Sequence, residues 1–358
     1  MRTRTAVLAS AVTAVLMVAA CSSGGTKLDG AAPTTSPPPP HNVVVATHDS
    51  WAAPKALLAG FESSSGFHLD VQTNGDAGEL TNKLVLTKDS PIADAVYGID
   101  NTFASRAIDA GVLAKYRSPA VTTTQYDIPG GADYLTPIDW GDVCVNVDDA
   151  WFAKHQLAAP SSLDDLIKPL YKNLFVAPGA ATSSPGFAFL LATIAQYGDS
   201  PSGGWQDYWK KLMANGTKLT SGWDDAFDVD YTAGGGNGDR PIVLSYNSDP
   251  VSSIPKGGTK PTTHALLNTC FRQVEYASVL AGAKNPVAAK AFIDFLASRA
   301  FQESLPDNMY VFPVDAGAKL PALWAKWAPP APHPLSVDPA QIAANRSNWL
   351  TQWSDITS

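Results

Sequence analysis

Short apolar runs alternate with amphipathic segments in the first part of the chain. Strands are predicted at 43–47, 67–71 and 93–97, and the first of these runs is apolar and β-branched, which is typical of a buried strand. The segments between and after them have helical spacing, at 51–65, 79–87 and 103–110. In the first of these segments, Trp51, Leu57, Leu58 and Phe61 share one face. This alternation predicts a parallel sheet with helices on both faces.

The same alternation continues toward the C-terminus. Further strands are predicted at 143–147, 173–177, 241–246 and 265–276. Further helices are predicted at 163–170, 185–197, 205–215, 286–298 and 339–353. The chain has 358 residues, 45% of them hydrophobic, so it can bury a large core. At this length two domains or lobes are expected rather than one.

The N-terminus has the pattern of a targeting segment. Residues 1–4 are cationic, and an apolar stretch follows at 6–20. This stretch is shorter than the roughly 20 residues that a helix needs to span a bilayer. Residues 1–20 are therefore interpreted as a signal peptide. Small residues before Cys21, followed by Ser and Gly, resemble a bacterial lipobox, which implies cleavage before Cys21 and its lipidation. Residues 21–41 form a Pro- and Ser-rich tether. An ordinary signal peptide with a chance cysteine stays the alternative.

Polar motifs occur where the predicted strands end. In open α/β sheets, ligands bind beyond the carboxyl ends of strands, although Asp and Ser there also cap helices. The motifs are Thr47–Ser50, Gly75–Gly78, Gly98–Asn101, Ala181–Gly186 and Ser245–Pro250. The hydroxyls at 182–184 precede an apolar helix, an arrangement that suits either an anion or plain capping. Trp223, Tyr246 and Tyr310 lie outside the core pattern and could hold a flat or cationic ring.

From about 43 to 353 the chain resembles the thiamine-binding substrate-binding proteins of bacterial ABC transporters. The matching strings are Asp49-Ser50, Gly98–Asn101, Gly111–Lys115, Thr182–Gly186, Gly222-Trp223, Val243–Tyr246 with Pro250, and Ala300–Gln302 with Pro313-Val314. The resemblance implies a two-lobed, type II periplasmic-binding-protein-like α/β fold with a ligand cleft between the lobes. We expect lobe 1 to hold 42–140 plus 271–358, and lobe 2 to hold 141–270.

The resemblance also implies the function and the site. The protein would be an extracytoplasmic, lipid-anchored monomer that passes thiamine or its phosphates to a permease, without a cofactor. Trp223, Tyr246 and Tyr310 would contact the rings. Asp76 and Ala77 match the positions of an acidic pocket pair in the first lobe, and Ser183 and Ser184 match a hydroxyl pair that receives a phosphate. The full set of expected ligand-binding residues is Asp49, Ser50, Asp76, Ala77, Asp100, Ser183, Ser184, Trp223, Tyr246, Asn247, Ser248, Asp249, Pro250 and Tyr310.

Two positions depart from the family pattern. Ala77 replaces a glycine, and Asp249 replaces a small hydroxyl residue. The Asp249 carboxylate could repel a ligand phosphate, favour a thiazolium cation, or cap the following turn. From the first two possibilities we expect unphosphorylated thiamine to bind better than its phosphates. Another small cationic or phosphorylated solute remains an alternative ligand.

The remaining cysteines also follow from the resemblance. In a two-lobed binding protein the segments that contain Cys144 and Cys270 run side by side, so in an oxidising compartment a disulfide is expected. The competing interpretation is a thiaminase-I-like enzyme on the same fold, with Cys144 as nucleophile, but the residues around Cys144 do not match that enzyme. The six histidines show no metal-ligand spacing. The net charge of −8 argues against nucleic acid as a partner.

Overall fold

The computed structural model describes residues 41–200 and 202–358. The signal peptide, Cys21 and nearly all of the predicted tether therefore lie outside the described residues. Across the described ranges, no helix combines the length and apolarity needed to cross a membrane.

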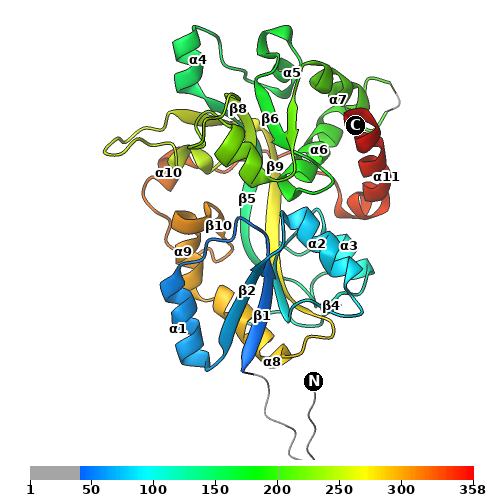
Figure 1. Ribbon diagram of the computed structural model, residues 1–358, viewed down its shortest axis with the longest axis vertical. Coiled ribbons are helices and arrows are strands. Elements are labelled where there is room, and N and C mark those ends of the chain that lie inside the picture. The colour runs from blue at the N-terminus through cyan, green and yellow to red at the C-terminus, as the bar shows by residue number, and fades with distance from the viewer. Residues whose placement is uncertain (1–40, 201) are drawn as a thin grey trace, which may run out of the picture. The chain divides into compact units, whose positions relative to one another are not determined.

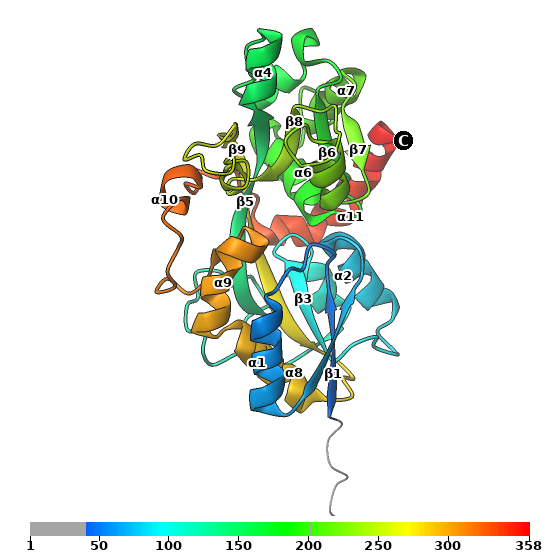
Figure 2. The ribbon, with the colours of Figure 1, turned by 60° about the vertical axis from the view of Figure 1, so that its left-hand side comes forward.

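One group of elements, called here the first lobe, is built on a small sheet. Its strands are β1 (Asn42–Thr47), β2 (His68–Thr73), β3 (Ala95–Asp100), β4 (Leu113–Ala114) and β10 (Phe312–Pro313). Its helices are α1 (Lys55–Ser65), α2 (Ala77–Leu86), α3 (Ala104–Asp109), α8 (Pro286–Leu296) and α9 (Arg299–Met309). Alternate residues of β1 and β3 bury their side chains against α1, α8 and α9 on one face and against α2 and α3 on the other. Figure 2 shows α1, α8 and α9 on one side of these strands and α2 on the other. Helices thus cover both faces, as the sequence predicted.

Two long strands connect this lobe to the next group of elements. Strand β5 spans Thr136–Asp148 and strand β9 spans Thr263–Leu280, and they pair antiparallel along most of their length. Both are longer than the apolar runs that predicted them. Figure 1 shows them side by side between the lower and upper elements. Strand β5 pairs with β10 in the first lobe and with β8 (Ile242–Tyr246) of the next group of elements, and β9 pairs with β3 and β4 in the first lobe and follows β5 along most of its length. The two strands therefore form the crossing segments of the fold.

The second group of elements is called here the second lobe. Its strands are β6 (Phe175–Pro178), β7 (Lys218–Thr220) and β8 (Ile242–Tyr246). Its helices are α4 (Asp149–His155), α5 (Leu163–Leu166), α6 (Ser184–Tyr197) and α7 (Trp205–Ala214). Three further helical turns are η1 (Pro169–Tyr171), the π-helical η2 (Asp225–Asp230) and η3 (Asp249–Val251). Helix α6 is buried on nearly every side, which explains why its residues are almost all apolar.

The prediction of a parallel sheet was only partly right. The strand order is β2-β1-β3-β9-β5-β8-β6-β7, with β10 on β5 and β4 on β9. The pairs β1–β2, β1–β3, β6–β7 and β6–β8 are parallel, whereas β9 pairs antiparallel with β3 and β5, and β5 pairs antiparallel with β8. The local strand–helix alternation predicted the parallel pairs. It carries no information on strands inserted from distant parts of the sequence.

The C-terminal helix differs from its expected position. The sequence grouped 271–358 with the first lobe, but α11 (Pro339–Thr357) packs on α7 (Figure 1). Its Trp349 and Trp353 are buried in the core of the second lobe, with Trp209 against Trp353. The short helix α10 (Trp324–Trp327), which precedes α11, lies against η3. The chain therefore crosses between the lobes once more after β9.

Prolines account for two predicted helices that were too long. Helix α1 begins at Lys55 because Pro54 occupies its N-cap, so Trp51 lies before the helix and packs on Tyr97 and Phe301 instead. Helix α5 ends at Leu166, and Pro169 opens the separate turn η1.

Cys144 and Cys270 form a disulfide, as predicted. The two residues lie on β5 and β9 with Cα atoms 4.2 Å apart, and both side chains are fully buried. The bond joins the two crossing strands where their register shifts, between Val143 and Val145.

Candidate functional site

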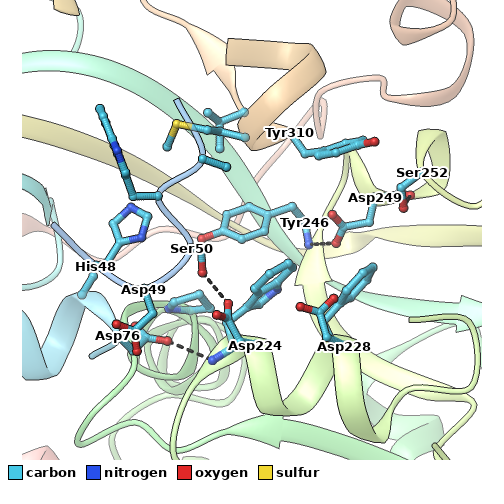
Figure 3. A pocket seen from close by; sticks show the side chains of 18 of the residues that line it. His48, Asp49, Ser50, Asp76, Asp224, Asp228, Tyr246, Asp249, Ser252 and Tyr310 are labelled. Atoms are coloured by element: carbon cyan, nitrogen blue, oxygen red, sulfur yellow. Dashed lines mark hydrogen bonds between the residues drawn. The ribbon is translucent and has the colours of Figure 1, made fainter. Parts of the chain in front are cut away.

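A cavity of about 550 Å³ lies between the two lobes. The first lobe contributes the loop after β1, the start of α2 and the end of α9. The second lobe contributes the end of β8, the turn η2 and the loop that follows it, and strand β9 supplies Gln273 and Glu275. Figure 3 shows the labelled side chains converging on this cavity from both lobes. A cavity of this size suits a small organic molecule.

Eight of the expected ligand-binding residues line the cavity. They are Asp49, Ser50, Asp76, Ala77, Trp223, Tyr246, Asp249 and Tyr310. The other six do not line it: Asp100, Ser183, Ser184, Asn247, Ser248 and Pro250.

Asp100, Ser183 and Ser184 are occupied within the protein. The Asp100 carboxylate accepts the Phe103 N–H at 3.0 Å at the start of α3, and the Ser184 hydroxyl donates to it. The Ser183 hydroxyl accepts the Gly186 N–H at 3.3 Å as the N-cap of α6. All three side chains are fully buried. Ser183 therefore caps α6, which is one of the two compatible roles that the sequence suggested for these hydroxyls.

The strand-end loop after β8 supports the cavity from behind. Asn247 accepts the Asp142 N–H at 3.1 Å and donates to the Pro329 carbonyl at 3.0 Å. The Ser248 hydroxyl donates to the carbonyl of Tyr310. These contacts hold the end of β8 and the end of α9 in place, so this loop positions cavity residues without lining the cavity at 247 or 248.

Aromatic side chains form much of the cavity wall. The Trp223 ring stacks on Phe227 with centroids 4.9 Å apart, and its Nε1–H donates to the Ser245 hydroxyl at 2.7 Å. The Tyr246 hydroxyl donates to Gln273 at 3.0 Å. In Figure 3, Tyr310 lies on the opposite side of Tyr246 from Asp224 and Asp228. Tyr310 has φ of 54°, the left-handed conformation that ends α9 and turns its ring toward the cavity.

The charged side chains around the cavity are almost all acidic. Six carboxylates line it: Asp49, Asp76, Asp224, Asp228, Asp249 and Glu275. Among the described residues that line the cavity, no lysine or arginine occurs, and His48 is the one histidine. Burial raises the pKa of Asp228, and the Asp224 carboxylate raises it further. The electrostatic field of this lining favours a cation over an anion.

The sequence did not single out the buried cluster at the base of the cavity. His48 Nε2 lies 3.5 Å from Glu275 Oε1, and the Tyr97 hydroxyl lies 2.6 Å from Asp139 and 3.1 Å from Glu275. Burial alone would lower the pKa of His48, but the charge and hydrogen bond of Glu275, together with the charges of Asp76 and Asp224, outweigh it, so this pKa is raised. Burial likewise opposes ionisation of Glu275, but the charge and hydrogen bond of His48, with hydrogen bonds from Asp139 and Tyr97, hold its pKa below the usual value. The two groups form a buried ion pair, with the pKa of Asp139 raised well above its ordinary value by burial and then by Glu275.

Other residues that line the cavity were also not predicted from the sequence. Asp224 and Phe227 lie on or next to the π-helical turn η2, which has no simple periodic signature. Gly234 lines the cavity because its backbone packs on Phe227: a Cβ there would lie 1.6 Å from the Phe227 carbonyl oxygen. Gln273 and Glu275 are polar residues inside an apolar strand. Their polarity at these positions is the feature of the sequence that could have identified them as site residues.

Asp249 lines the cavity and is also held by the backbone. Its carboxylate accepts the Tyr246 N–H at 2.7 Å and so binds the end of β8 rather than the turn that follows. Burial raises its pKa to about 7, with hydrogen bonds from Ser245 and Tyr246 opposing the rise. At neutral pH this carboxylate is therefore only partly charged, which reduces its effect on a ligand.

Hydrogen bonds cross from one lobe to the other beside the cavity. Asp76 accepts the N–H groups of Ser184 and Trp223, each at 3.0 Å. The Ser50 hydroxyl donates to Asp224 at 2.5 Å (Figure 3). These contacts require the lobes to be close together, so the structure has the closed arrangement.

The comparisons with known proteins agree with this geometry. Residues 47–303 match the family of bacterial extracellular solute-binding proteins. The chain belongs to this family. The solute-binding protein is 30% identical over 326 residues to the thiamine-binding periplasmic protein of Escherichia coli, covering 88% of the chain and 93% of that relative. It is 28% identical to the thiamine-binding periplasmic protein of Brucella melitensis, with coverage of 88% and 92%.

A solved structure is similar over nearly the whole length. The periplasmic thiamin binding protein aligns with a TM-score of 0.77 and 28% identity, covering 92% of this chain and 100% of that one. The solute-binding protein therefore has the type II periplasmic-binding-protein fold, as the sequence predicted.

Within residues 41–358, position 201 aside, no group of three or more His, Cys, Asp or Glu side chains is arranged to hold a metal ion.

Proposed function

We propose that the solute-binding protein captures thiamine between its lobes and delivers it to the permease of an ABC transporter. The observation that carries this proposal is a cavity with aromatic walls, six carboxylates and, among its described lining residues, no lysine or arginine. Thiamine joins a flat aminopyrimidine to a positively charged thiazolium ring, so it matches both properties of the lining. The names of the Escherichia coli and Brucella relatives support the same ligand.

The two properties of the lining act on different parts of the ligand. Trp223, Tyr246 and Tyr310 offer ring faces, and a cation over such a face gains about 0.5–2 kcal/mol, more as water is excluded. The carboxylates Asp224 and Asp228 face the same space and add attraction for the thiazolium charge. A ligand that is both aromatic and cationic uses both contributions.

Unphosphorylated thiamine is expected to bind more tightly than its mono- and diphosphate, because a phosphate would enter an acidic site. Isothermal titration calorimetry with the three compounds at pH 7 measures this directly. Tighter binding of either phosphate would contradict the expected order. Absence of binding by all three would contradict thiamine as the ligand. A solute with neither ring nor positive charge, such as glucose, is the control and is expected to give no heat of binding.

We propose capture rather than reaction. A thiaminase-I-like enzyme would need a thiolate nucleophile, and Cys144 is paired with Cys270 and does not line the cavity. In the same calorimetric samples, chromatography is expected to recover the thiamine unchanged after incubation with aniline as an added nucleophilic base. Release of free thiazole would instead indicate catalysis.

The transport cycle follows from the two-lobed arrangement. An open form admits the ligand, and the ligand shifts the population toward the closed form because it contacts both lobes. The closed form, as a monomer, would then dock on the permease. In this scheme the contacts of Asp76 and Ser50 across the cleft belong to the closed state and contribute to its stability.

We further propose that the protein is exported and held at the outer face of the cell membrane by lipid on Cys21. The order of cationic segment, apolar stretch, small residues and cysteine supports this. The mature chain is expected in the membrane fraction, with an N-terminal peptide whose mass includes acyl chains on Cys21. A Cys21→Ser variant is expected to be released in soluble form. A wild-type protein cleaved at another site and without acyl chains would contradict the proposal.

A further inference from the structure

Five of the six carboxylates that line the cavity accept hydrogen bonds from the protein itself. The five are Asp49, Asp76, Asp224, Asp249 and Glu275. Backbone N–H groups or hydroxyls are the donors in each case, so the fold already engages these side chains. The sixth carboxylate, that of Asp228, has neither a hydrogen bond nor an ion pair with any residue that the structure describes. Both of its oxygens are therefore available to a ligand.

Asp228 is held in place by its backbone rather than by its side chain. It lies in the π-helical turn η2, and such turns are rare and are often found at functional sites. The glycine-rich loop that follows packs closely on this turn. A Cβ at Gly236 would lie 2.5 Å from the Asp228 carbonyl oxygen, and a Cβ at Gly234 would lie 1.6 Å from that of Phe227. This packing positions the Asp228 carboxylate without using its oxygens.

The charge next to Asp228 also favours a cation there. Asp224 lies four residues earlier, about one helical turn away, and Figure 3 shows both carboxylates on the side of Tyr246 that is opposite Tyr310. Burial raises the pKa of Asp228, and the Asp224 charge raises it further. The two carboxylates therefore repel each other when both are ionised, and a cation beside them relieves that repulsion.

We propose that Asp228 is a specificity-determining residue: its unpaired carboxylate forms an ion pair with the positively charged ring of the ligand and so makes the site select aromatic cations over neutral molecules of the same shape. This inference rests on the proposed function, since it names the group that recognises the charge of the ligand in the same cavity.

A purely structural role for Asp228 predicts a different result. A change in the shape of the cavity or in the stability of the closed form weakens charged and neutral ligands by a similar factor, because both need the same closure. Loss of a charge pair weakens the charged ligand alone. The ratio of the two dissociation constants therefore separates the two roles.

The test is calorimetry at pH 7 with thiamine and with deazathiamine, in which a neutral thiophene ring replaces the thiazolium. Asp228→Asn keeps the size of the side chain and removes its charge. It is expected to lower the ratio of the deazathiamine Kd to the thiamine Kd by about tenfold, because a partly solvated charge pair is lost. Asp228→Glu keeps the charge and is expected to retain most of the wild-type ratio.

Asp239→Asn is the matched control. The Asp239 side chain is 81% exposed and does not line the cavity, so its replacement is expected to leave the ratio unchanged. An equal fall of the ratio in this variant would contradict the inference, because it would assign the effect to the net charge of the protein. A thermal melt of each variant shows that the fold is intact, so a changed ratio is assigned to the site.

The remaining outcomes separate this inference from the proposed function. A wild type that binds neither compound contradicts the proposed function, and this inference with it. A wild type that binds both compounds equally well leaves the capture of thiamine standing and contradicts the recognition of its charge. A wild type that prefers thiamine, with the same preference in Asp228→Asn, contradicts only the role of Asp228.

Discussion

Replacing both Cys144 and Cys270 by alanine is expected to lower the free energy of unfolding by about 4–5 kcal/mol. The disulfide closes a loop with a sequence separation of 126 residues, and a cross-link of that span removes a large part of the conformational entropy of the unfolded chain. Urea unfolding followed by circular dichroism, with and without the two substitutions, measures the difference.

The position of the disulfide allows the loss of unfolding free energy to be assigned to the bond itself. It joins the crossing strands β5 and β9 in a buried site beside Ala331, so alanine leaves little polar surface exposed and the added cavity is small. Wild type unfolded in the presence of a reductant is the control and should match the double variant. A difference of less than about 1 kcal/mol would contradict the expectation, because it would mean that the unfolded chain is not constrained by the bond.

Trp223→Ala is expected to weaken thiamine binding by about 1–3 kcal/mol, or roughly 5- to 150-fold in Kd. The Trp223 ring forms part of the cavity wall and is held in place by Phe227 on one face and by the Ser245 hydroxyl at Nε1. Alanine removes the ring face and leaves the Ser245 hydroxyl without its donor. Calorimetry with thiamine gives the change.

Two further variants test whether the Trp223 ring itself contacts the ligand. Trp223→Phe keeps a ring and loses the hydrogen bond to Ser245, so it should retain most of the affinity if ring contact dominates. Trp327→Ala removes a tryptophan of α10 that does not line the cavity and should bind thiamine as the wild type does. Affinity of Trp223→Ala within twofold of the wild type would show that the ring does not contact the ligand.

The candidate site was predictable where a residue type and a strand end coincide. Asp49, Asp76 and Tyr246 follow or end apolar runs, and parallel strands bring their carboxyl ends to one edge. The same rule failed for Asp100 and Ser184, because a strand-end carboxylate and a helix N-cap have the same local sequence. Whether such a residue faces a ligand or another helix depends on the opposing lobe. Here Ser184 donates to Asp100, so each satisfies the other.

Local patterns predicted most of the longer strands and helices, because period-2 and period-3.6 burial needs only neighbouring residues. The expectation of two lobes came from the chain length and from the family resemblance. The paired cysteines and the ligand class came from a resemblance across the whole chain. Only the tertiary structure decided the antiparallel insertion of β9, the packing of α11 on the second lobe, and the cluster of His48, Glu275, Asp139 and Tyr97. These depend on contacts between residues far apart in sequence, where the energy of burial and of charge pairing outweighs any local preference.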